Sequence, residues 1–174
     1  MKDLSTADWM HTQAADCWIS IGNLARAGAE LGEISPASRE HPDVLKVRWN
    51  SCAQAHEWDV CLDIATTLTQ IAPERPFGWI HLALSLRRLG KFRAAIRVLR
   101  DAIKQFGETP TLLLSLACCH ARLRSLSQAA KCLKRAFDLA EDQQARDRLL
   151  IRAFDEPDLE PVWQGDRGSL DGLP

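Results

Sequence analysis

The fold of this chain is decided by residues 76–109, which read PFGWIHLALSLRRLGKFRAAIRVLRDAIKQFGET. Apolar side chains recur there in two runs at spacings of three and four, which predicts two amphipathic helices. The runs are Trp79, Leu82, Ala83 and Leu86, then Phe92, Ala95, Leu99 and Ala102. Gly90 lies between them, where a helix end favours a left-handed residue, and Pro76 lies where the first helical position tolerates a missing N–H. The stretch therefore predicts a helix-turn-helix hairpin.

The hairpin is one copy of an internal repeat. Pro42, Pro76 and Pro110 lie 34 residues apart, and one further step back reaches Asp8, an N-cap residue type at which another helical pattern begins. Blocks starting at 8, 42, 76 and 110 therefore align without a gap, and such a period indicates stacked repeats. One column of the repeat holds only small residues, which predicts the close crossing of the two helices in each hairpin: Ala27, Cys61, Ala95 and Ala129.

The end of the chain departs from the repeat. A last apolar pattern predicts a capping helix over about residues 143–154, with Leu149, Leu150, Ala153 and Phe154 on its inner side. Residues 155–174 form an acidic tail with two early prolines, so we expect it to be extended, and disordered beyond Gln164. Trp163 either packs onto the cap or is free to bind another molecule. The expected fold is all-α: an α-solenoid of four hairpins in a single domain over residues 8–154, with the cap helix and the tail.

The chain resembles the tetratricopeptide repeat (TPR) family, whose unit is 34 residues. The resemblance lies in the positions of tryptophan, leucine, glycine and alanine within each block. The resemblance covers roughly residues 8–141 and is most specific in the third and fourth blocks. The compact spacing and the tail resemble small bacterial members of the family. Arg124 and His56 replace the turn glycine in two blocks, and Trp49 replaces a small residue, so we expect a distorted crossing in the second block.

Composition argues against a membrane protein and against a metal or disulfide site. No stretch approaches the roughly 20 apolar residues of a membrane span, and the first residues lack a signal-peptide pattern, so the expected compartment is the cytoplasm. Five of the six cysteines fall on predicted helices, at or beside packing columns, and are expected to be buried free thiols. Cys118, Cys119 and His120 are consecutive, whereas ligands on one helix need a spacing of three or four. We expect neither a metal nor a cofactor.

Charge is unevenly distributed although the net charge is only −1. Residues 87–135 hold twelve Lys or Arg against two acidic side chains, and acidic stretches lie on both sides of them. Part of this basic block is a stripe at helical spacing on the second helix of the third block: Arg93, Arg97, Arg100 and Lys104. The stripe is either a solvated outer face or a surface that attracts an acidic partner.

Candidate binding residues follow from the resemblance, because ligands of this family commonly lie along the concave side formed by the first helices. Projecting the repeat onto that side gives the predicted partner-binding residues: Lys46, Asn50, Gln54, Phe77, Arg87, Arg88 and Arg122. An apolar surface that carries such hydrogen-bond donors suits a peptide with carboxylate side chains. Some members clamp the C-terminus of heat-shock chaperones with five residues, but only Lys46 and Asn50 match, so chaperone binding is not expected.

The sequence thus predicts a non-catalytic interaction module or scaffold that binds an acidic or mixed segment of another protein. No phosphate loop, metal-spaced cluster or catalytic triad is visible, and His81 and His120 are isolated, so an enzyme is not expected. One alternative is that the acidic tail docks on its own repeats or on a second copy, giving autoinhibition or a homodimer. A less favoured alternative is nucleic-acid binding through the basic block, because Trp79 and Phe92 are assigned to core columns and leave few aromatic rings for base stacking.

Overall fold

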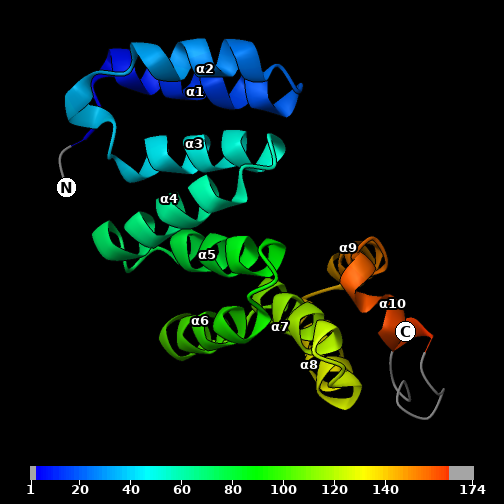
Figure 1. The fold of residues 1–174 in the computed structure, drawn as a ribbon. Helices are drawn as coiled ribbons and strands as arrows, with labels where there is room; N and C mark the ends of the chain where they lie inside the picture. Colours follow the sequence, from blue (N-terminus) through cyan, green and yellow to red (C-terminus); the bar gives the residue numbers. More distant parts are fainter. Residues whose placement is uncertain (1–2, 165–174) are drawn as a thin grey trace. The chain divides into compact units, whose positions relative to one another are not determined.

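A computed structural model describes residues 3–164, and the elements of this part of the chain are all helical. The chain divides into two compact units, Met1–Ser85 and Leu86–Pro174, with the division inside α5 (Pro76–Arg88). The preceding elements, shown in Figure 1, are α1 (Thr6–Ser20), α2 (Leu24–Glu33), the 3₁₀ turn η1 (Pro36–Ser38), α3 (Pro42–Gln54) and α4 (Trp58–Ile71). The following ones are α6 (Phe92–Phe106), α7 (Pro110–Arg122), α8 (Leu126–Asp138), α9 (Gln143–Phe154), the 3₁₀ turn η2 (Pro157–Leu159) and α10 (Glu160–Trp163). The all-α prediction is confirmed.

Helix starts follow the repeat where proline begins the block. Pro42, Pro76 and Pro110 are the first residues of α3, α5 and α7, a position at which the absent N–H would have no intrahelical partner. The second helix of the first block ends at Glu33, before Pro36, and η1 follows it. The proline spacing therefore sets the register of three of the first helices, and α1 is the exception.

The prediction that Asp8 is an N-cap is wrong. Ser5 caps α1, because its hydroxyl accepts a hydrogen bond from the Asp8 N–H at 3.1 Å. The carboxylate of Asp8 instead accepts from the Ser35 N–H and from the hydroxyls of Ser35 and Ser38, each at 2.8 Å. The Ser35 N–H is the main cause that holds the pKa of Asp8 well below its usual range. Asp8 therefore ties α1 to the loop after α2.

All four hairpin turns have the same backbone conformation. The turn residues lie 34 positions apart and have positive φ: Gly22 (78°), His56 (59°), Gly90 (72°) and Arg124 (60°). In each turn the following N–H donates to the carbonyl five residues earlier, at 2.8–2.9 Å. This is the Schellman bond that closes a helix with a left-handed residue. The conformation predicted at Gly90 is therefore kept where the glycine has been replaced.

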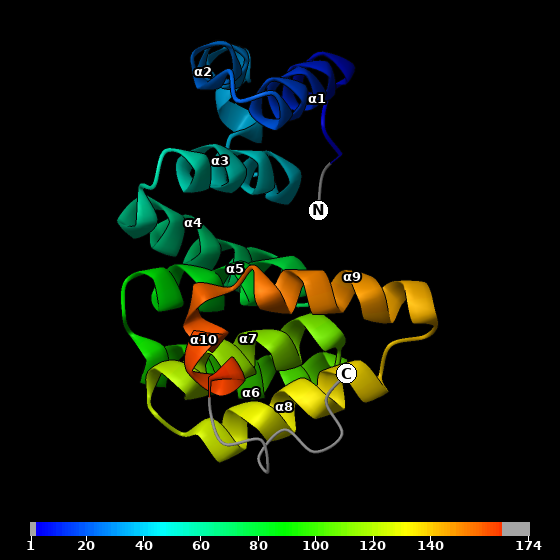
Figure 2. The same ribbon diagram turned by 90° about the vertical axis from the view of Figure 1, so that its right-hand side faces the viewer.

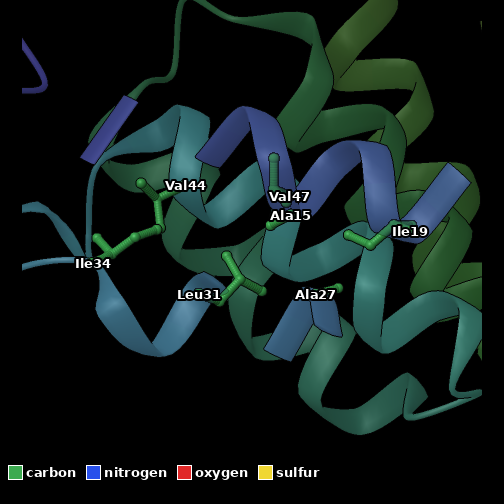
Figure 3. Close-up of a cluster of buried hydrophobic side chains, with 7 residues drawn as sticks. All are labelled: Ala15, Ile19, Ala27, Leu31, Ile34, Val44 and Val47. Atoms are coloured by element: carbon green, nitrogen blue, oxygen red, sulfur yellow. The ribbon is translucent and has the colours of Figure 1, made fainter. Parts of the chain in front are cut away.

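The small-residue column is buried as predicted. Ala27, Cys61, Ala95 and Ala129 have no exposed surface, which places the close crossings of the hairpins at this column. Figure 3 shows the core of the first unit, to which α1, α2 and α3 each contribute side chains: Ala15, Ile19, Ala27, Leu31, Ile34, Val44 and Val47. The apolar columns of the sequence thus form the core that holds neighbouring helices together.

The second hairpin accommodates a tryptophan where other blocks have alanine. Trp49 is buried, and its indole Nε1 donates to the hydroxyl of Ser85 at 3.2 Å. Its ring also meets His81 edge-on, with the centroids 4.1 Å apart. The Cys61 Sγ still lies 3.7 Å from the carbonyl oxygen of Trp49. The large ring therefore packs against α5. The helices α3 and α4 still approach each other closely, where we expected a distorted crossing.

The cysteines are free thiols, and several are deeply buried. Burial raises the pKa of Cys61 and of Cys118 to about 12, and that of Cys119 to about 11, whereas Cys17 is exposed. Within residues 3–164, no three His, Cys, Asp or Glu side chains gather in a way that would hold a metal ion. In the same range, none of the helices combines the length and the apolar composition that a membrane span requires.

Candidate functional site

Two predicted binding residues of the first unit are engaged by a neighbouring helix. Asn50 Nδ2 lies 3.4 Å from Asp16 Oδ1, and Gln54 Nε2 donates to the carbonyl of Ile19 at 2.9 Å. Both acceptors belong to α1, whereas both amides belong to α3. These amides therefore join two consecutive repeats, and each already uses one of its two N–H donors for this contact.

Lys46 and Phe77 are brought together in the same unit. The Lys46 Nζ lies 5.6 Å from the centroid of the Phe77 ring, within the range of a cation–π contact. The same ring also contacts His81, stacked at 3.7 Å with 19° between the planes. Burial lowers the pKa of His81 to about 4, so this imidazole is neutral at neutral pH. His81 therefore adds no charge beside that of Lys46.

Arg87 is the most deeply placed of the predicted residues. Its side chain is 5% exposed, although it carries a permanent charge. Its Nη2 lies 3.0 Å from both carboxylate oxygens of Glu156, and its Nε lies 3.6 Å from Asp158 Oδ2. A buried guanidinium is tolerated only when it is paired, and these two carboxylates supply the pairing.

Arg122 lies on the other side of the same carboxylate. Its Nε is 3.6 Å from Asp158 Oδ1, and its guanidinium carbon is 5.4 Å from the centroid of the Phe92 ring. In contrast to Arg87, its side chain is 53% exposed. Arg88 is also exposed, next to Arg87 in the last turn of α5. The structure therefore brings Arg87 and Arg122, which we call the arginine pair, to one aspartate.

The acidic tail is helical where we expected it to be extended. Pro157 and Pro161 stand in the first turns of η2 and α10, where proline removes no hydrogen bond, so they start helical turns and do not prevent them. Leu159 and Val162 are buried, in a segment where η2 contacts α7 and α10 contacts α8. Figure 2 shows α10 beside α8. We call residues 156–163 the C-terminal segment.

Trp163 packs onto the capping helix, which was one of the two predicted outcomes. Its ring stacks on that of Phe154 with the centroids 4.7 Å apart and 27° between the planes. Phe154 itself is exposed, contrary to its predicted place on the inner side of α9, whereas Leu149 and Ala153 are buried there. The disorder expected beyond Gln164 falls outside the described residues.

The basic stripe of α6 is exposed, and it differs from the arginine pair in what it binds. Arg93, Arg97 and Arg100 are exposed on this helix. Lys104, which ends the stripe, bonds to Asp101 on the same helix at 2.9 Å. An exposed ion pair of this kind contributes little to stability. The stripe is therefore exposed to solvent, whereas the arginine pair contacts the C-terminal segment.

Sequence comparison identifies the repeat. Residues 76–117 match the family model described as tetratricopeptide repeat. A comparison with curated proteins finds no match. Among solved structures, the chain is similar to a thermophilic TPR protein of Thermus thermophilus, at 18% identity over 96% of this chain and 92% of that chain, with a TM-score of 0.69. Tetratricopeptide repeats generally mediate protein–protein interaction, and their proteins are typically non-catalytic scaffolds. The family match thus covers residues 76–117, and the chain as a whole shares the fold of a solved TPR protein.

Proposed function

We propose that this chain is a non-catalytic module that binds an acidic or mixed segment of another protein. The observation that carries the proposal is the burial of Arg87 beneath Glu156 and Asp158. Guanidinium groups bind carboxylates through fixed, directional hydrogen bonds, so this environment suits a peptide with acidic side chains. Arg122 extends the basic surface toward solvent, where an incoming carboxylate would meet it first.

Apolar contacts beside the charges support the mixed character of the partner. Leu159 and Val162 are buried in the segment that contacts α7 and α8, next to the arginine pair. In the first unit, Lys46 beside Phe77 offers the same combination of a cation and an apolar ring. We therefore keep these residues, together with Arg88, in the proposed binding set. Asn50 and Gln54 would contribute through the shape that their bonds to α1 maintain.

The side chains that perform catalysis elsewhere are poorly suited to it here. A nucleophilic cysteine needs a lowered pKa, whereas burial raises the pKa of Cys118 and Cys119. His81, a general-base type of residue, has its pKa lowered by burial, and its Nδ1 lies 2.8 Å from the carbonyl oxygen of Phe77. These environments support a non-catalytic role.

Affinity capture from a lysate of the source organism tests the proposal. The wild-type chain is compared with Arg122→Glu and with the matched control Arg97→Glu, which reverses an exposed charge on α6. Circular dichroism first establishes that all three are equally helical. We expect a protein that the wild type and the control both capture and that Arg122→Glu loses.

Other results would contradict the proposal in distinct ways. Equal capture by all three chains would exclude Arg122, and loss only with Arg97→Glu would move recognition to the stripe of α6. Capture that disappears after nuclease treatment would favour the nucleic-acid alternative. Each outcome thus assigns recognition to a different surface.

Self-association is the second candidate, and a specific contact favours it. The bonds from Glu156 and Asp158 to the arginine pair join parts of one chain here, and the same bonds made between two copies would produce a dimer. Light scattering of the wild type and of Glu156→Gln/Asp158→Asn tests this candidate. A dimer that the substitutions dissociate would support it, and a wild-type monomer at all concentrations would exclude it.

A further inference from the structure

We infer that the C-terminal segment is a displaceable stand-in for the partner, and that the partner carries the same pattern of side chains. The pattern is two carboxylates two residues apart, followed by apolar side chains three and six residues after the first carboxylate. In this chain they are Glu156, Asp158, Leu159 and Val162. This inference rests on the proposed function, because it describes the partner of the same surface.

The carboxylates fit the arginine pair incompletely. Glu156 binds the Arg87 Nη2 closely, whereas Asp158 is 3.6 Å from the Nε atoms of both Arg87 and Arg122, beyond hydrogen-bond length. The Arg87 Nε is buried and makes no hydrogen bond within residues 3–164. A buried donor without an acceptor is costly. A partner carboxylate closer to this Nε would therefore bind better than Asp158 does.

The C-terminal segment itself holds a second unsatisfied donor. The Trp163 Nε1 is also buried and makes no hydrogen bond among the described residues. Tryptophan normally finds an acceptor when its indole nitrogen is buried. The segment is thus anchored by the stacking of Trp163 on Phe154 while leaving a polar atom unpaired. Arg87 and the C-terminal segment thus each keep one buried donor unsatisfied, which indicates a ligand that occupies the surface without saturating it.

The conformation of the segment depends on what it touches. η2 and α10 span only Pro157–Leu159 and Glu160–Trp163, and neither has a side-chain N-cap bond. Helices this short are not stable alone in water. Their order therefore comes from the apolar contacts of Leu159 and Val162 with the rest of the unit. An incoming segment that makes the same contacts can replace this one without the loss of a long helix.

The tethered C-terminal segment should compete with a free segment for the arginine pair, and this competition can be measured. A tethered segment acts at an effective concentration of roughly millimolar, so it weakens the binding of a free competitor. For a free segment with micromolar affinity, the apparent weakening could reach about a thousandfold, which is the ratio of the effective concentration to the dissociation constant. Releasing the tethered segment should restore the full affinity.

Fluorescence anisotropy with a labelled peptide tests the inference on the full chain. The peptide has the sequence of residues 155–164, DEPDLEPVWQ. Leu159→Asp in the protein places a charge at a fully buried position, which should release the segment and leave the arginine pair intact. The matched control is Ile151→Asp, at an exposed position of α9. We expect the peptide to bind Leu159→Asp at least about tenfold more tightly than the wild type or the control.

A second variant and a second peptide complete the test. Glu156→Gln/Asp158→Asn in the protein weakens the charged contact and keeps Leu159, so it serves if Leu159→Asp unfolds. A peptide with the same two amide substitutions should lose most of its binding, because it cannot neutralise the arginine pair. Equal peptide affinity for the wild type and both released variants would overturn the displacement. Equal binding of the two peptides would overturn the pattern.

The capture experiment separates this inference from the proposed function. A protein captured through Arg122, together with a peptide that binds no variant, would leave the proposed function and overturn the inference. Peptide binding to the released chain without any captured protein would contradict the proposed function alone. A wild-type dimer that Leu159→Asp dissociates would show exchange of the segment between copies and overturn its role as an intrachain stand-in.

Discussion

Replacing Glu156 with glutamine should destabilise the chain, because it removes the main partner of a buried charge. Arg87 has a side chain that is 5% exposed, and Glu156 has one that is 24% exposed. Glutamine keeps the size of the side chain while it removes the carboxylate that lies 3.0 Å from the Arg87 Nη2. The change therefore isolates the charge from the packing.

The magnitude follows from what remains around Arg87. Hydrogen bonds to charged groups contribute about 1.5–3 kcal/mol, and Asp158 still lies 3.6 Å from the Arg87 Nε. Glu156→Gln should thus cost about 1.5–2 kcal/mol. Adding Asp158→Asn leaves the guanidinium without a carboxylate, and breaking a buried pair in this way costs about 3–5 kcal/mol. Adding Arg87→Met to the doubly substituted chain should recover at least half of that loss, because the uncompensated charge is then gone.

Urea denaturation followed by far-UV circular dichroism measures these free energies. Glu160→Gln is the matched control: it lies in the same segment, is exposed, and bonds only to Gln164 among the contacts described, at 2.8 Å. The control should remain within about 0.5 kcal/mol of the wild type. Because buried pairs are screened little, the loss in Glu156→Gln should persist at high salt. A Glu156→Gln chain as stable as the control would refute the pairing of Arg87 in solution.

Three further results are expected. Arg124→Gly should raise the free energy of unfolding by about 0.5–1 kcal/mol, because the strain relieved at φ 60° exceeds the entropic cost of a glycine. Gly90→Ala should lower the free energy of unfolding, because alanine is strained at the positive φ of this turn. Urea midpoints of the two variants that do not move in opposite directions would contradict this. Ala95→Leu should cost about 1–3 kcal/mol by overpacking a fully buried crossing, and an unchanged midpoint would exclude the crossing. Thermal melts should show stability falling as the pH drops from about 6.5 to 4, because His81 has a folded pKa of about 4 and takes up its proton mainly in the unfolded state. His81→Phe should reduce this dependence of the melting temperature on pH.

The repeat could be predicted from the sequence because its signals recur. Proline at the helix starts and small residues at the crossings each appear several times at one interval, so chance agreement was small. The start of α1 could not be predicted in this way, because Ser5 and Asp8 are both good caps three residues apart. The choice between them depends on Ser35, which only the folded chain brings to the Asp8 carboxylate.

The candidate site was harder to predict, because the contacts of long side chains and of the tail depend on the folded chain. Projection of a repeat gives the direction of a side chain, but Asn50 and Gln54 are long enough to bond to the preceding helix. The sequence shows that the acidic tail and the basic block are complementary in charge, whereas it does not show that the tail is helical. Two prolines in a short stretch argue against a helix, yet Pro157 and Pro161 stand at first-turn positions, where proline costs no hydrogen bond.

The buried thiols give each unit its own chemical reporter. Cys61 lies in the first unit, Cys118 and Cys119 lie in the second, and their raised pKa values keep them protonated at neutral pH. Thiol reagents attack the thiolate, so these positions should be modified only when local unfolding admits water. After the exposed Cys17 and the half-buried Cys52 and Cys132 are replaced by serine, the rates of modification at the two places would measure the opening of each half separately. The chain thus carries native probes of whether its halves open together or one at a time.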